Sequence, residues 1–104
     1  LFRQQDEEKV KESFNHYNTT AQNAAKAGNK SLAAKAFYNA GDVMMAAQQY
    51  DKAIDYFKQS LKNDPSDHEA RYNLVLAQKL LQKNQDQNQD DQQDQQQQQQ
   101  DQSL

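Results

Sequence analysis

The stretch FYNAGDVMMAAQQYDKAIDYFKQSLKNDP, residues 37–65, decides the fold of this chain. Two small residues, Gly41 and Ala53, stand where a pair of helices could approach closely, and Phe37 and Phe57 stand beside them. The apolar positions follow the 3.6-residue period of amphipathic helices. The stretch therefore predicts two antiparallel helices, with Phe37 and Phe57 meeting between them.

The signals at the end of this stretch predict where the next helix begins. Proline disfavours helical backbone for the residue before it, so Pro65 ends the second helix. Ser66 is followed three residues later by Glu69, which is the spacing of a capping box. A further helix is therefore expected to start near Asp67, with Ser66 as its N-cap.

Before residue 37 the chain contains one other turn signal. Gly28 and Asn29 supply a turn or helix C-cap, after which Ser31 can cap the next helix. Nothing interrupts a helix over residues 7–27, so this helix should be long. Residues 1–6 are expected to hold the end of an earlier helix and the turn after it.

One short sequence element occurs twice. YNAG at residues 38–41 is echoed by YNLV at residues 72–75, and the two copies lie 34 residues apart. A 34-residue period is that of the tetratricopeptide repeat (TPR), a helix-turn-helix unit that stacks into solenoids. The chain resembles a TPR repeat at the positions that define its pattern, which are Phe37, Ala40, Gly41, Met44, Ala53, Phe57, Ser60 and Pro65.

This resemblance implies an all-α fold, a TPR-type α-solenoid of antiparallel helix pairs in a right-handed superhelix. We interpret residues 1–83 as the helical array. It comprises a truncated repeat (1–30), a complete repeat (31–65) and a C-terminal capping helix (66–83), which such arrays need to cover an exposed apolar end. Residues 84–104 then form a separate low-complexity tail rich in Gln and Asp.

The tail and the body differ in charge. Residues 1–83 carry 12 basic and 10 acidic side chains, whereas residues 84–104 carry five acidic ones and no basic one. Nearly every tail residue is Gln, Asp or Asn, so the tail has no apolar surface whose burial could offset the entropy of ordering. The composition predicts disorder, with helix carried over from Leu80 and Leu81 for a turn or more as the open alternative. It also leaves open whether the tail is a spacer, a polar partner site or a segment without a specific role.

A second resemblance concerns the end of the array. Residues 64–79, DPSDHEARYNLVLAQK, followed by a Gln-rich segment, resemble the C-terminal part of the Bat aerotolerance family of exported TPR proteins. Residues 34–41, AKAFYNAG, are similar to the start of the preceding repeat in that family. The resemblance implies a bacterial protein of the periplasm or cell envelope. It also implies partners among the von Willebrand A-type Bat proteins, and a role in tolerance of oxidative stress.

TPR proteins mostly bind other proteins, and the first helix of each pair lines the concave face. We therefore expect a groove on the helix of residues 33–47 and on the next first helix, with Tyr38 and Tyr72 as anchors and Asn39 and Asn73 bonding to a partner backbone. The predicted partner-binding residues are Lys35, Tyr38, Asn39, Asp42, Met45, Glu69, Tyr72, Asn73, Leu76 and Leu80. The alternative is that both tyrosines pack between neighbouring helices.

Other functions find no support in the sequence. The two histidines, His16 and His68, belong to no catalytic or metal-binding motif, and no phosphate loop or nucleophile elbow occurs, so we expect no enzyme, no cofactor and no metal. The body has no basic stripe for nucleic acid, and no apolar run is long enough to span a membrane. A carboxylate clamp for chaperone tails is rejected, because Asp42 would repel a carboxylate.

Two functional classes remain. Either the chain is an interaction module that recruits a partner protein, or it is a structural solenoid segment that self-associates and has no specific ligand. Val10, Phe14 and Tyr17 would be partly uncovered in a repeat that lacks its first helix. An exposed apolar patch of this kind favours homo-oligomers through open repeat ends.

Overall fold

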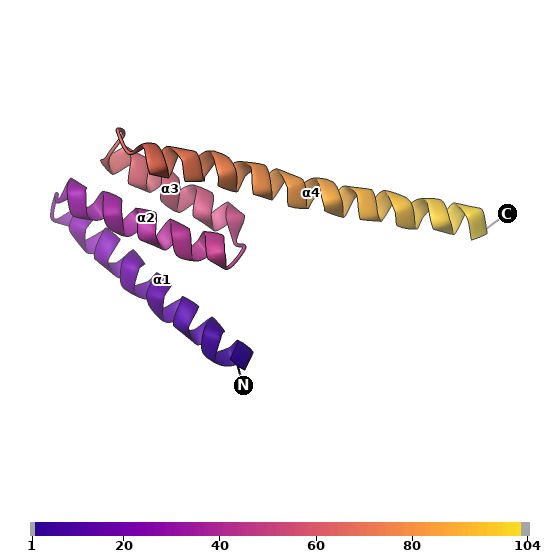
Figure 1. Ribbon diagram of the computed structural model, residues 1–104, viewed down its shortest axis with the longest axis horizontal. Coiled ribbons are helices and arrows are strands. Elements are labelled where there is room, and N and C mark those ends of the chain that lie inside the picture. The colour runs from indigo at the N-terminus through magenta and orange to yellow at the C-terminus, as the bar shows by residue number, and fades with distance from the viewer. Residues whose placement is uncertain (1, 103–104) are drawn as a thin grey trace.

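The computed structural model describes the backbone of residues 2–102 and the side chains of residues 4–87. The chain forms four helices, which are α1 (Phe2–Lys26), α2 (Lys30–Ala46), α3 (Tyr50–Asn63) and α4 (His68–Gln102). Helices that follow one another along the chain pack together, α1 on α2, α2 on α3 and α3 on α4 (Figure 1). No strand occurs within residues 2–102, so the predicted all-α fold of antiparallel helix pairs is confirmed.

The turn between α1 and α2 lies where the sequence places it, but its cap does not. Gly28 adopts φ +76°, the left-handed conformation that glycine tolerates best. The N-cap of α2 is Asn29, whose side-chain oxygen accepts a hydrogen bond from the Leu32 amide at 3.2 Å. The prediction that Ser31 caps this helix is wrong, because α2 already begins at Lys30 and Ser31 therefore lies inside its first turn.

The start of α4 shows the same kind of difference. The helix begins at His68, close to the predicted residue. Its cap is Asp67, whose carboxylate accepts from the Ala70 amide at 3.1 Å. The Ser66 hydroxyl instead donates to the Asp64 carboxylate at 2.6 Å, so the predicted capping box is wrong. Asp64 lies two residues before Ser66, and its carboxylate binds the Ser66 hydroxyl that would otherwise cap the helix.

This geometry predicts which side chain supports the first turn of α4. Asp67→Ala removes the cap and is expected to lower the free energy of unfolding by about 1 kcal/mol. Ser66→Ala removes an exposed side-chain hydrogen bond and should change it by less than about 0.5 kcal/mol. Urea unfolding followed by circular dichroism measures both values. A larger loss for Ser66→Ala than for Asp67→Ala would contradict the assignment.

The buried side chains form two clusters. The first lies between α1 and α2 and consists of Ala21, Ala24, Ala33, Ala36 and Phe37. The second joins α2, α3 and α4 and consists of Met44, Ala53, Phe57 and Ala77. Alanine supplies four of the five residues in the first cluster and two of the four in the second, so the helices can approach closely.

The expectation that Phe37 and Phe57 meet between the paired helices is wrong. Phe37 belongs to the cluster with α1, and Phe57 to the cluster that reaches α4. The side chain of Tyr56 packs against both clusters, and its ring centroid lies 6.3 Å from that of Phe37. Because α2 sits between α1 and α3, its residues divide between two neighbours, and Phe37 turns to the α1 side.

Small residues do allow α2 and α3 to approach, as the sequence predicts. A Cβ atom on Gly41 would lie 2.6 Å from Cε1 and 2.8 Å from Cδ1 of Phe57, so the phenylalanine ring occupies the space that a side chain would need. Ser60 is fully buried beside this contact. Its hydroxyl donates to the Ala34 carbonyl at 2.8 Å, which satisfies a polar group inside the helix pair.

Both ends of the chain are more helical than the sequence predicts. The turn expected within residues 1–6 is wrong, because α1 runs without a break from Phe2; Leu1 lies outside the described residues. The disorder expected from residue 84 differs from the structure, in which α4 continues as helix through Gln102. Glutamine has a good helix propensity, and no glycine or proline interrupts the segment. Residues 103–104 of the predicted tail lie outside the described residues.

Candidate partner-binding surface

Three of the predicted groove residues connect α2 with α4. Asn73 of α4 donates from its amide nitrogen to two side chains of α2, the Tyr38 hydroxyl at 2.9 Å and the Asp42 carboxylate at 3.3 Å. These two bonds link side chains of α2 and α4, which both pack against α3. We call this surface the α2/α4 face. It consists of Lys35, Tyr38, Asn39, Asp42, Asp67, Glu69 and Asn73, together with the exposed Tyr72 beside Asn73 on α4.

A shallow pocket of about 310 Å³ opens on the α2/α4 face. It is lined by Lys35, Tyr38, Asn39, Asp67 and Glu69. Four of these five residues are predicted groove residues, and the spacing of positions along α2 was sufficient to select three of them. Asp67 was missed as a lining residue, because its place after Pro65 and Ser66 indicated only the start of a helix.

The electrostatic balance of the α2/α4 face is negative. The pKa of the Asp42 carboxyl is raised, first by burial and also by the nearby charge of Glu69, while the hydrogen bond from Asn73 opposes this shift. The pKa of the Tyr38 hydroxyl is raised by burial and then by the charges of Asp42, Glu69 and Asp67, and is lowered by the Asn73 bond. Lys35 is the one basic side chain among the described residues that line the pocket.

The two predicted anchors, Tyr38 and Tyr72, have different surroundings. The ring of Tyr38 packs against Phe57, with centroids 5.8 Å apart, and its hydroxyl accepts from Asn73, so this tyrosine also connects helices. Tyr72 is 69% exposed. The amide nitrogen of Asn73 is already engaged within the chain and is therefore a structural link rather than a free donor for a partner.

The other predicted groove residues do not line this pocket. Met45 is half-buried and packs against the cluster around Phe57. Leu76 and Leu80 are half-buried on α4. The helical period places these residues near the predicted face of each helix, but it does not show which of them the neighbouring side chains cover in part.

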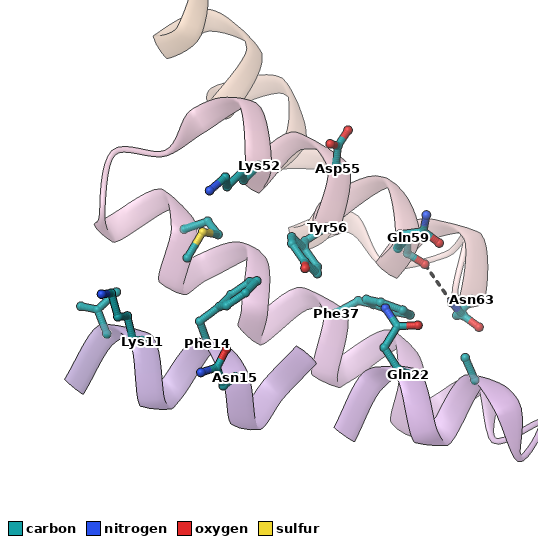
Figure 2. Close-up of a pocket in the computed structure, with 13 residues that line it drawn as sticks. Lys11, Phe14, Asn15, Gln22, Phe37, Lys52, Asp55, Tyr56, Gln59 and Asn63 are labelled. Atoms are coloured by element: carbon teal, nitrogen blue, oxygen red, sulfur yellow. Dashed lines mark hydrogen bonds between the residues drawn. The ribbon is translucent and has the colours of Figure 1, made fainter. Parts of the chain in front are cut away.

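A second and larger cavity, of about 770 Å³, was not predicted from the sequence. It lies between α1 and α3 over the surface of α2, and we call it the α1/α3 groove (Figure 2). Its apolar lining residues are Val10, Phe14, Ala25, Phe37, Met44 and Tyr56. The sequence signal for this region is the apolar spacing of Val10 and Phe14 on the long first helix. This spacing predicts a packing face, but it does not predict the cavity beside that face.

Comparison with known proteins assigns the central helix pair. Residues 34–67 match the family model of the tetratricopeptide repeat. This segment is therefore a TPR repeat, and the helices around it have the arrangement of a TPR-type solenoid. No curated protein and no solved structure matches the chain.

TPR repeats generally mediate protein–protein interactions, and an all-helical repeat fold of this type is typical of a non-enzymatic scaffold. Within the described part of the chain, no group of three or more potential metal ligands is found. None of the helices described combines the length and apolar character that a membrane crossing requires.

Proposed function

We propose that this chain is a protein-interaction scaffold that binds an extended segment of a partner protein on its α2/α4 face. The observation that carries the proposal is the pocket in which Tyr38 and Asn39 of the matched repeat lie next to Glu69, one turn before the exposed Tyr72. Exposed tyrosines beside a concave polar surface are common features of binding hot spots. Helices in tandem repeats present such surfaces in register.

The charges of the α2/α4 face select the chemistry of the partner. Asp42, Asp67 and Glu69 outnumber the single Lys35 there. A partner segment with lysine or arginine side chains would gain from these carboxylates and could place its aliphatic stems along Tyr72. Acidic peptides and nucleic acids would be repelled, which agrees with rejecting a carboxylate clamp.

The likeness of residues 64–79 to the Bat aerotolerance family extends this proposal to a particular partner class. We propose a von Willebrand A-type protein of the bacterial cell envelope as the bound protein, in a complex that serves oxidative-stress tolerance. Mixing the chain with a purified von Willebrand A-type Bat domain tests this extension by calorimetry. Absence of heat at concentrations where the α2/α4 face binds basic peptides would remove the extension and leave the scaffold proposal intact.

The scaffold proposal itself is tested with a displayed library of random peptides. Selection on the chain is expected to enrich sequences that contain lysine or arginine. The double variant Asn39→Ala/Tyr72→Ala should then weaken the selected peptides about tenfold or more, since both side chains contact the partner without supporting the core. Fluorescence anisotropy with labelled peptides measures the change.

A matched control comes from the opposite helix. Lys58→Ala changes an exposed residue of α3 and should leave the affinity unaltered, and circular dichroism should show equal helicity for all variants. If the library yields no binder, or if Asn39→Ala/Tyr72→Ala binds as well as the parent chain, the α2/α4 face is not the binding surface.

A further inference from the structure

The pocket of the α2/α4 face has two walls of opposite charge. Its wall on α2 carries Lys35, which is exposed and stands one turn before Asn39. Its wall at the start of α4 carries two carboxylates, those of Asp67 and Glu69. The other lining residues, Tyr38 and Asn39, are uncharged at neutral pH. A segment bound in the pocket therefore meets a cation on one side and anions on the other.

The two carboxylates differ in the bonding capacity that they have left. The Asp67 carboxylate caps α4 by accepting from the Ala70 amide at 3.1 Å, and this side chain is half-buried. Glu69 is exposed in the first turn of the helix. An ionised carboxylate accepts several hydrogen bonds. Glu69 is therefore the main contact for a partner cation, and the charge of Asp67 adds to its attraction.

The third acidic residue of the face lies outside the pocket. The Asp42 carboxylate accepts from Asn73 at 3.3 Å and does not line the pocket. Burial raises the pKa of the Tyr38 hydroxyl, and the charges of Asp42, Glu69 and Asp67 raise it further. All three carboxylates therefore lie close to this tyrosine, and they favour a cation on the α4 side of the pocket.

Lys35 is the one basic residue that lines the pocket among the described residues. Arg71 at the start of α4 donates to the Pro65 carbonyl at 2.7 Å and is not a lining residue. Any selection against a second partner cation in the pocket must therefore come from Lys35.

The size of the pocket limits how far apart the recognised charges can stand. Its volume of about 310 Å³ is at the lower end of the range for ligand pockets, about 300–1,000 Å³. Only a short part of an extended segment fits inside. Successive side chains of an extended chain point to opposite sides. Neighbouring residues of a segment that runs between α2 and α4 would therefore reach opposite walls.

From this arrangement we infer that the partner segment carries an acidic residue directly beside its lysine or arginine, an inference that rests on the proposed function of the α2/α4 face. The basic side chain bonds to Glu69, and the neighbouring acidic side chain bonds to Lys35. A uniformly basic segment would place a second cation against Lys35 and bind less well. Lys35 thus makes the pocket select a pattern of charges rather than a net charge.

The peptides selected on the chain test this pattern first. Sequences with an acidic residue next to the lysine or arginine should be enriched over sequences in which one residue separates the two charges. In a labelled peptide from this selection, replacing the acidic residue by glutamine should weaken binding about three- to fivefold, because one exposed ion pair is lost. Fluorescence anisotropy measures the change.

Reversing the charge of the α2 wall should reverse the preference. Lys35→Glu is expected to weaken the selected peptide by at least the same factor. It should bind a second peptide, in which lysine replaces the acidic residue, better than it binds the first. The control Lys58→Glu makes the same change at an exposed position of α3 outside the pocket and should keep the original preference. Circular dichroism should show equal helicity for both variants.

The outcomes separate this inference from the proposal on which it rests. The inference is overturned if peptides bind through Asn39 and Tyr72 but carry no acidic residue beside the basic one. It is also overturned if Lys35→Glu leaves the preference between the two peptides unchanged. Either result leaves the α2/α4 face as the binding surface, whereas a selection that yields no binding peptide would overturn both.

Discussion

Phe57→Ala is expected to cost about 3–5 kcal/mol of folding free energy, the largest loss expected from a single substitution in the bundle. Phe57 is the largest side chain with no exposed surface among the described residues, and it contacts the cluster that joins α2, α3 and α4. The total free energy of unfolding of a small domain is only about 5–15 kcal/mol. The variant should therefore be mostly unfolded near room temperature, or unfold at much lower urea than the parent, as circular dichroism would show.

Phe14 provides the comparison for this prediction. It is also a phenylalanine, but it is half-buried and lies at the open groove. Phe14→Ala removes the same number of atoms from a site that water already reaches in part, so its cost should be clearly smaller. Equal losses for Phe57→Ala and Phe14→Ala would show that the centre of the core has been placed incorrectly.

Gly41→Ala is expected to destabilise the chain by about 1–3 kcal/mol, although alanine is the better helix former. The new Cβ atom would lie 2.6 Å from the Phe57 ring, and a fully buried ring has little room to retreat. Phe57→Leu removes Cε1 and Cζ, two of the three ring atoms nearest to the new Cβ, and leaves a more flexible side chain. The double variant Gly41→Ala/Phe57→Leu should lose less unfolding free energy than the two single variants lose together. The difference, which is the coupling energy, should be at least about 0.5 kcal/mol.

The other glycine of the chain supplies the control for this cycle. A Cβ atom on Gly28 would have no other atom within 4 Å, but the φ of +76° at this residue penalises any side chain. Gly28→Ala should therefore cost about 1–2 kcal/mol through the backbone alone. Its loss should add to that of Phe57→Leu without coupling, as measured by urea unfolding. Coupling at Gly28, or its absence at Gly41, would contradict the steric account.

The sequence predicts those features that depend on local chemistry. Gly28 and Pro65 mark turns because of their backbone restrictions, and Gly41 marks a close contact because no other residue fits there. The two N-caps were misassigned because several residues within each turn can cap, and the choice depends on where the first helical residue falls. The extent of helix in the tail was not predicted. A polar composition indicates that no core can form there, but glutamine still favours helical backbone.

The sequence predicts one of the two candidate surfaces, the α2/α4 face, but not the α1/α3 groove. Helical periodicity brings Lys35, Tyr38 and Asn39 onto one side of α2, and the structure places all three at the pocket. The α1/α3 groove depends on the angle at which α1 leaves the bundle. Two large rings, Tyr56 and Phe14, meet at one end of this interface, whereas small side chains such as Ala24 pack at the other end of α1. Such a balance between distant contacts leaves no periodic pattern to detect.

The continuity of α4 has a mechanical consequence. Leu81 is the last half-buried residue among its described side chains, so residues 82–102 form a rod about 32 Å long that extends beyond the bundle. The packed part of α4 that precedes this rod carries Glu69 and Tyr72, where a partner is proposed to bind. A tilt of roughly 10° where the rod begins would move its far tip by about 6 Å. A partner that changes the direction of α4 on binding would in this way displace the end of this acidic helix by several ångströms.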